Sequence, residues 1–367
     1  MTNQQIGAPD GWRVISAIYV KDSIGAIRDW ATLALVVGAA MVLLTAQAGS
    51  LLASLVDREI VLAYAPAHSS MLRQMRRFEN PSVVPVDSFE ELQIAIADAP
   101  DVRVGVVVPA NAEENLEMGE AIALDVFYAH WAELEEVNTL IERLALRLKQ
   151  DFTNEIKLKV QSEGLYPRAE GGGRSLMVTS ALVIGVLSIG TFLTPYLLAE
   201  EREQGTLNVL LLSPASAGQI VFAKALVGLT YCLIVGFVGM FFNWHFVVHP
   251  WLAFLSMLLL GFFSVCLGLY IGLLARQLST VNLWMVVSFL ILIVPTILLF
   301  ADITVIPGWV DLLLGWIPTV ASGRLLRISF LESIQLPILL QPLAALCLFT
   351  VASFGVVIFQ LRQQDRG

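Results

Sequence analysis

The stretch "EEREQGTLNVLLLSP" at residues 200–214 places three acids and an arginine directly behind a long apolar run. Another apolar run begins at about residue 219. A charge near the middle of a bilayer costs on the order of 2.5–3.5 kcal/mol, so this cluster marks the boundary between membrane and water. Gly205 permits a change of direction, and Pro214 ends the leucine-rich part. We expect residues 201–214 to form a short surface helix, which either contacts a cytoplasmic partner or rests on lipid.

The composition is that of a membrane protein. The chain is 57% apolar and 14% charged, with a mean hydropathy of +0.74, whereas soluble domains are nearer half apolar and about a quarter charged. A span of the hydrocarbon core takes roughly 20 residues. Blocks of that length lie at about 32–56, 176–199, 219–243, 251–275, 281–301 and 338–361. None has the form of a cleaved signal peptide, so we expect six permanent spans.

Charge indicates the orientation. Residues 57–174 hold 21 acids and 12 Lys or Arg, and therefore carry the whole net charge of −9. Orientation follows Lys and Arg in short loops rather than long domains. With the N-terminus inside, the basic residues on the cytoplasmic side are Arg13, Lys21, Arg28, Arg202, Lys224, Arg276, Arg362 and Arg366. The opposite short loops hold only Arg324 and Arg327. We expect both termini inside and residues 57–174 outside.

The region between the first two apolar blocks has the pattern of an α/β domain. Short apolar runs predict strands at 59–66, 82–86 and 102–109. Helices are predicted at 69–80, 87–99 and, as one long polar helix, 130–164. Ser88 and Glu91 have the spacing of a capping box. The stretch "EGGGRS" at 170–175 is expected to be a hinge.

Several kinds of chemistry find no support in the sequence. His68 and His130 lack ligand spacing, so no metal site is expected. The three cysteines, Cys232, Cys266 and Cys347, fall inside spans, where thiols act as small hydrophobes. The spans hold almost no ionisable groups, which argues against an embedded enzyme or a proton relay and suits hydrophobic or amphipathic cargo.

Two further sequence features concern ATP and packing. No Gly-x-x-x-x-Gly-Lys-Ser/Thr occurs, so we expect ATP to be hydrolysed by another polypeptide. Gly268 and Gly272, spaced i and i+4, allow close helix approach either within the chain or across a dimer.

The longer stretch "EEREQGTLNVLLLSPASAGQIVFAKA" (200–225) resembles the signature of ABC-2 type transporter permeases. In that family this helix is a coupling helix that docks on the ATPase subunit. The positions that match the signature are Glu201, Arg202, Glu203, Gly205, Thr206, Leu207, Leu210, Leu211, Ser213, Pro214 and Lys224. Asn208 stands where the family usually has glutamate, and Ala223 where a glycine precedes the lysine.

Two flanking motifs resemble the same family and appear in the same order. The first is the family's N-terminal interfacial helix, for which "VKDSIGAIRDW" (20–30) offers Lys21, Asp22, Arg28 and Asp29. One face of this predicted helix carries Trp12, Ile15, Tyr19, Ala26 and Trp30, with Lys21 and Arg28 on the other side. The second is an external or re-entrant segment, at 302–337, whose matching positions are Pro307, Gly308, Trp309, Pro318, Thr319 and Arg324.

The predicted fold is therefore a membrane all-α bundle of six transmembrane helices, with an extracytoplasmic α/β domain inserted between helices 1 and 2. Its parts are a cytoplasmic N-terminus with an interfacial helix (1–30), the first span (31–56), the external domain (57–174) and the permease core (175–367).

The resemblance implies the non-enzymatic permease subunit of an ABC exporter in the cell's inner membrane. It implies a lipid bilayer, an ABC ATPase subunit that carries the ATP and Mg, and a second permease subunit, identical or not. No cofactor on this chain and no nucleic acid are expected. The alternative is a membrane receptor or sensor with an external ligand-binding domain. A receptor should carry a C-terminal output domain, yet this sequence ends six residues after the last predicted span.

Overall fold

The computed structural model describes residues 11–28, 38, 60–65, 69–99, 102–152, 155–160, 164–168, 172–203, 216–275, 277–300 and 307–364. The first predicted span and residues 204–215 lie outside these ranges, apart from Gly38. The helices that form the bundle are α7 (Gly173–Ser188), α8 (Thr194–Glu203), α10 (Ala217–Phe242), α11 (Pro250–Leu274), α12 (Leu278–Phe300) and α15 (Leu336–Gln364).

Five stretches of the described chain are long and apolar enough to cross a membrane. They are Gly173–Ala199, Gly218–Phe242, Pro250–Leu274, Leu278–Ile297 and Leu336–Gln363. Each coincides with a predicted span to within about five residues, a scatter that is ordinary for helix ends. The agreement follows from the length rule, because an uninterrupted apolar run of this size satisfies its own backbone only as a helix.

The span Gly173–Ala199 contains a wider turn. Between α7 and α8, residues Ile189–Leu193 form a π-helix, η1, so one continuous rod runs from Gly173 to Glu203. Short π segments of this kind commonly occur at functional sites. Thr194, directly after the π-helix, is fully buried and faces Gly228 of α10.

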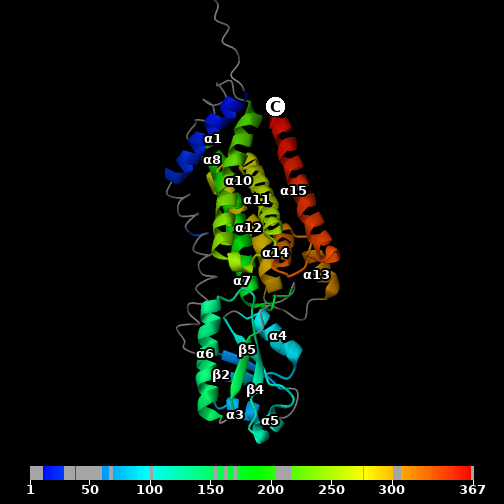
Figure 1. Ribbon diagram of the computed structural model, residues 1–367. Helices are drawn as coiled ribbons and strands as arrows, with labels where there is room; N and C mark the ends of the chain where they lie inside the picture. Colours follow the sequence, from blue (N-terminus) through cyan, green and yellow to red (C-terminus); the bar gives the residue numbers. More distant parts are fainter. Residues whose placement is uncertain are drawn as a thin grey trace, which may run out of the picture.

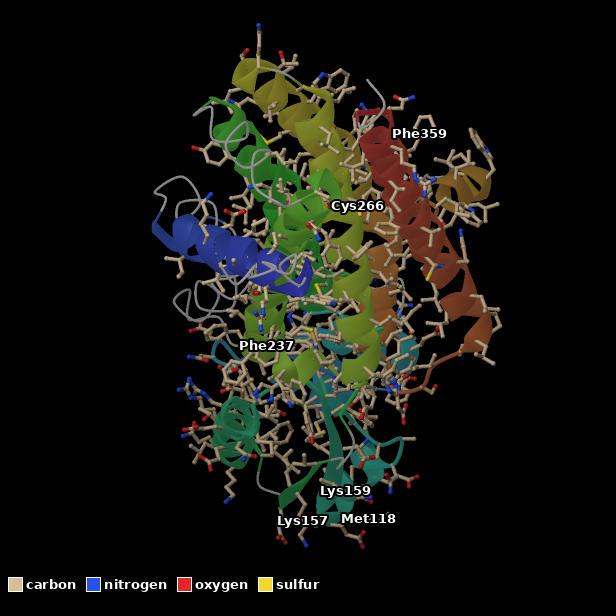
Figure 2. All side chains as sticks on the ribbon, turned by 90° about the horizontal axis from the view of Figure 1, so that it is seen from above. Met118, Lys157, Lys159, Phe237, Cys266 and Phe359 are labelled. Atoms are coloured by element: carbon tan, nitrogen blue, oxygen red, sulfur yellow. The ribbon has the colours of Figure 1, made fainter. Side chains whose placement is uncertain are left out.

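The centre of the bundle is made by α11 and the α7–η1–α8 rod. In these two spans, 67% of the most apolar stretch is buried, against 28% in α12 and in α15. Cys266 of α11 lies among the helices, whereas Phe237 of α10 and Phe359 of α15 lie on the periphery (Figure 2). The outer helices therefore present apolar side chains outward, as expected for surfaces that contact lipid or another subunit.

The glycines of α11 are used for packing within the chain. A Cβ added to Gly268 would lie 2.4 Å from the carbonyl oxygen of Gly190, and one added to Gly272 would lie 3.0–3.2 Å from atoms of Leu198 and Pro195. The i, i+4 glycine spacing thus lets α11 approach the backbone of η1 and α8 closely. Of the two roles that the sequence left open for these glycines, the structure shows packing within the chain.

Residues 60–168 contribute a five-stranded sheet in the order β2-β1-β3-β4-β5. The strands are β1 (Ile60–Tyr64), β2 (Ser82–Pro85), β3 (Val104–Val107), β4 (Ile122–Tyr128) and β5 (Ile156–Val160). Neighbouring strands are parallel except β3 and β4, which are antiparallel. The helices that accompany the sheet are α3 (Ser70–Met75), α4 (Phe89–Ala97), α5 (Ala112–Met118) and α6 (Leu134–Asp151).

Strand β3 lies at the centre of this sheet. Its residues Val104 and Val106 are fully buried, as the nearly continuous apolar run predicts for a strand covered on both faces. Gly105, between them, faces Leu92 and Ile96 of α4. Figure 1 shows the strands between α4 and α6.

The predicted long helix at 130–164 is wrong. The helix α6 ends at Asp151, and the chain then adds the strand β5 at the edge of the sheet. In β5, Ile156 and Leu158 alternate with Lys157 and Lys159, a period of two that belongs to a strand with one exposed face. The strand β4 was not predicted, and α3 ends at Met75 rather than near residue 80.

The start of α4 follows the predicted capping pattern with one difference. The Ser88 hydroxyl accepts a hydrogen bond from the Glu91 amide at 3.0 Å. The Glu91 carboxylate accepts from the Asp87 amide, also at 3.0 Å, and not from that of Ser88. The two side chains still satisfy two backbone donors at the helix start.

The sheet lies at one end of the molecule, and helix α1 (Gly11–Arg28) and the C-terminal end of α15 lie at the other (Figure 1). Helix α1 packs along α10, and in Figure 1 it lies near the C-terminal end of α15, far from the sheet. The remaining short helices are η2 (Trp244–Phe246), α13 (Gly308–Leu314) and α14 (Pro318–Ile328). Of these, α14 is largely buried and packs against α7, α11, α12 and α15.

Candidate functional site

The site is built around residues 204–215, which are flanked by α8 and α10. The chain enters α10 at a capping box: the Ser216 hydroxyl accepts from the Gln219 amide at 3.3 Å, and the Gln219 side chain accepts from the Ser216 amide at 3.0 Å. A capped start gives α10 a defined first turn. The described chain thus stops at the last turn of α8 and resumes at this capped first turn of α10.

A buried ion pair lies two turns into α10. The Lys224 ammonium donates to the Asp22 carboxylate of α1 at 3.0 Å and to the Leu197 carbonyl of α8 at 3.0 Å. The Lys224 and Asp22 residues are only 1% and 7% exposed. Taking two charges out of water is costly unless both are well paired, so this geometry holds three helices at one point.

Apolar and hydrogen-bonding contacts extend the same junction along α1. Ile18 of α1 packs against Ile220 and Ala223 of α10. Ala223, which stands where the family signature has a glycine, is fully buried under this contact. The Tyr231 hydroxyl donates to the Ser23 carbonyl at 3.0 Å, and the Tyr19 and Thr230 hydroxyls are 3.1 Å apart. Helix α1 is thus fixed to α10 over several turns.

The predicted residues of the interfacial helix are distributed as follows. Lys21 is exposed, with its ammonium 3.9 Å from the Asp22 carboxylate. Arg28 is the last residue of α1, and Asp29 lies outside the described residues. Trp12, expected on the apolar face, is 72% exposed, whereas Ile18, Asp22 and Ala26 are buried. The face of α1 that packs on α10 therefore carries Ile18, Asp22 and Ala26, which are spaced four residues apart.

The predicted coupling residues lie at the end of α8 and beyond it. Glu201, Arg202 and Glu203 form the last turn of α8. The positions outside the described residues are Gly205, Thr206, Leu207, Leu210, Leu211, Ser213 and Pro214. The pairing of Asp22 with Lys224 was missed by the sequence analysis. The available signal was the position of Asp22, which lies four residues after Ile18 and four before Ala26 and therefore on the same helix face.

The third predicted group lies in α13 and α14. Pro307, Gly308 and Trp309, at the start of α13, are exposed. Pro318 and Thr319 begin α14 and are buried. The Thr319 hydroxyl donates to the Leu292 carbonyl of α12 at 2.7 Å, and the Thr296 hydroxyl donates to Thr319 at 2.8 Å.

Arg324 has a separate role in this group. Its guanidinium donates to the Asp311 carboxylate and thereby ties α14 to α13. The Thr319 and Arg324 contacts together fix α14 inside the bundle, at the end nearest the sheet (Figure 1).

Aromatic side chains join the sheet to the bundle. Trp131 stacks on Phe246 of η2 with ring centres 5.1 Å apart, and Phe246 lies 6.0 Å from Phe330. His130 stacks on Tyr166 at 4.5 Å. Burial lowers the pKa of His130 to about 4, so the imidazole is neutral at pH 7. The guanidinium of Arg174, at the start of α7, lies over the same stack, 5.0 Å from the Trp131 ring centre and 5.5 Å from that of Phe246, so the contact combines aromatic packing with one cation.

Within the described ranges, no three His, Cys, Asp or Glu side chains come close enough together to hold a metal ion. The cysteines Cys232, Cys266 and Cys347 are free thiols.

Comparison with known proteins identifies the family. Residues 30–359 match the family described as ABC-2 family transporter protein. A search of curated proteins gave no match. The match covers nearly the whole chain, including the sheet, residues 204–215 and the long apolar helices up to residue 359 of α15, while α1 precedes it. The chain is thus an integral membrane protein that belongs to the ABC-2 transporter family.

Proposed function

We propose that this chain is the permease subunit of an ABC exporter and that residues 201–214 form the helix on which a separate ATPase subunit docks. The observation that carries the proposal is the three-way contact of Lys224 with Asp22 and Leu197. It joins α1, α8 and α10 next to the two points where residues 204–215 connect to the bundle. ATP and Mg belong to the partner in this scheme, and the chain itself binds no cofactor.

The same contacts supply a route for the conformational change. A push on residues 204–215 moves the first turns of α10, and the buried ion pair makes α1 move with it. At the other end of the segment, α8 packs against α11 and α12. ATP hydrolysis on the partner is thereby converted into a relative displacement of helices that surround the translocation path.

We infer the substrate class and the membrane setting from the apolar bundle and its exposed faces. The bundle is apolar, which suits a hydrophobic or amphipathic substrate rather than a bare ion. The exposed faces of α12 and α15 suit lipid and a second permease subunit. We place both termini in the cytoplasm and the protein in the inner membrane. The sheet, together with the segment 302–337 that includes α13 and α14, then lies outside, which is consistent with their shared end of the molecule (Figure 1).

The docking proposal is tested by Leu210→Asp. Burial of a leucine side chain is worth roughly 1.5–3 kcal/mol, and the new carboxylate must also lose water. We expect at least about a tenfold loss of ATPase association while insertion in the membrane is unchanged. The measurement is co-purification of the ATPase, together with stimulated ATP hydrolysis in proteoliposomes.

Two variants serve as matched controls for Leu210→Asp. Thr206→Ala removes one hydroxyl and should cost about 1 kcal/mol at most. Glu203→Lys should weaken association mainly at low salt, because salt screens the attraction between charges at the rim of an interface. If Leu210→Asp retains the ATPase and turns over like the parent, residues 201–214 rest on lipid and the docking site lies elsewhere.

The orientation is tested with two single cysteines, at Glu117 and at Gln204. The background carries Cys347→Ser, because Cys347 is exposed while Cys232 and Cys266 are buried. In intact cells, a membrane-impermeant thiol reagent should label the cysteine at 117, at the tip of the sheet domain, and spare the one at 204. Permeabilised cells should show both labelled. The opposite pattern in intact cells would reverse the assigned topology.

A further inference from the structure

A cleft lies at the seam between the sheet and the bundle. Its volume is about 540 Å³, within the range of small-molecule sites. One wall is α4, another is Phe127 of β4 with residues 164–168, and Glu332 closes the side that belongs to the bundle. The cleft therefore combines groups from two parts of the chain that are far apart in sequence.

The floor of the cleft is apolar and aromatic. Ile94 and Ala97 of α4 face Phe127, Leu165 and Tyr166. The Phe127 ring is held edge-on against Phe89 with centres 5.3 Å apart, and Tyr166 is held by its stack on His130. Both rings are half-buried, so each keeps surface that a ligand can cover. Their π faces attract organic cations more strongly than anions.

The rim of the cleft is acidic. Its one basic side chain, Arg168, is engaged by Asp98: the guanidinium Nε and Nη2 atoms each lie 3.4 Å from a carboxylate oxygen, and the backbone amide donates to the other oxygen at 3.4 Å. The carboxylates of Glu90 and Glu332 have no ion-pair partner among the residues that the structure describes. The rim thus presents two open carboxylates and one guanidinium that is engaged by Asp98.

We propose that this cleft binds a small amphipathic cation, with its ring system on Phe127 and Tyr166 and its positive group between Glu90 and Glu332. An aromatic floor under an acidic rim is the arrangement that such a molecule requires, because apolar burial and charge attraction then act on its two ends. An anion of the same shape would face both carboxylates and is excluded.

The cleft lies where a bound ligand would act on segments that are connected to the membrane helices. Helix α4 continues into Asp98 and Ala99, and the Arg174 amide at the start of α7 donates to the Ala99 carbonyl at 3.2 Å. Gly173 packs so closely on the Asp98 carbonyl that no side chain fits there. Glu332 follows α14. A cation that bridges Glu90 and Glu332 therefore draws the segment that leads into α7 towards the segment that follows α14.

The test uses two dyes with the same xanthene ring system. The full-length protein is placed in phosphatidylcholine nanodiscs without any ATPase, and binding is followed by fluorescence anisotropy, with empty nanodiscs subtracted. Cationic rhodamine 6G is expected to bind and anionic fluorescein is not. Glu90→Gln together with Glu332→Gln should weaken rhodamine binding by about tenfold.

The matched control is Glu117→Gln, which removes another exposed carboxylate, in α5 at the far tip of the sheet domain (Figure 1), and should leave binding unchanged. Thermal unfolding of each variant verifies the fold, and the single changes Glu90→Gln and Glu332→Gln give intermediate losses. Absent binding of rhodamine 6G, equal binding of both dyes, or full binding by the double variant overturns the proposal. Because no ATPase is present, failure here is independent of the docking site at 201–214.

Discussion

A Lys224→Met variant is expected to lose about 3–5 kcal/mol of stability, because it leaves the buried Asp22 carboxylate with only the exposed Lys21 ammonium, 3.9 Å away. Methionine has nearly the length and volume of lysine, so the apolar packing of α10 is retained. The Asp22 carboxylate and the Leu197 carbonyl, however, both lose the ammonium that lies 3.0 Å from each. The measurement is the thermal unfolding of purified protein in nanodiscs, followed by intrinsic fluorescence.

Two further variants distinguish the effect of breaking the buried ion pair from the effect of removing any nearby charge. Lys21→Met removes an exposed ammonium 3.9 Å from the same carboxylate and should change stability by less than about 1 kcal/mol. Asp22→Leu combined with Lys224→Met removes both charges and should recover most of the loss, since apolar replacements of buried pairs are often tolerated. Parent-like unfolding of Lys224→Met would show that the pair does not hold the junction.

Gly268→Ala is expected to destabilise the bundle by up to about 3 kcal/mol, the upper part of the range for overpacking. The added Cβ would lie 2.4 Å from the Gly190 carbonyl oxygen and 2.9 Å from the Pro195 ring. Neither neighbour is the end of a flexible side chain, so α11 must separate from η1 and α8. Folded yield and the midpoint of thermal unfolding report the effect.

Gly355→Ala provides the matched control for Gly268→Ala. Gly355 also lies inside a long apolar helix, but an added Cβ there would meet nothing within 4 Å. The same substitution should therefore stabilise α15 by about 0.5–1 kcal/mol, through the lower backbone entropy of alanine. Equal effects at the two positions would mean that the contact between α11 and Gly190 is not tightly packed.

Five of the six predicted spans coincide with long apolar helices, because each span depends on a local property; the first, at 31–56, lies outside the described residues apart from Gly38. An uninterrupted apolar run of about 20 residues has one stable structure in a bilayer. The strand β5 was missed because its five residues, with two lysines, lie in a polar stretch that also suits a helix. Its identity as a strand depends on β4, which pairs with it residue by residue from Ile122 to Val126.

The junction of α1, α8 and α10 shows that contacts between distant helices could not be predicted from the sequence. Periodicity indicated that one face of α1 is apolar, and the family signature included Lys224. Neither feature relates positions 22 and 224, because a buried pair is specified by the packing of helices and not by spacing along one of them. Likewise, the spacing of Gly268 and Gly272 indicated close approach of some helix, and only the packed bundle identifies η1 and α8 as that helix.

The π-helix at Ile189–Leu193 alters the helical phase of the span that contains it. Each residue of an α-helix advances by about 100°, and a π turn takes in an extra residue, so positions before and after it fall out of step. Before this turn, α7 packs mainly on α10 and α14; after it, α8 packs mainly on α11 and α12. The neighbours α10, α11 and α12 are shared by both halves of the rod, but the packing on α10 is heavier before Ile189–Leu193 and the packing on α11 is heavier after it.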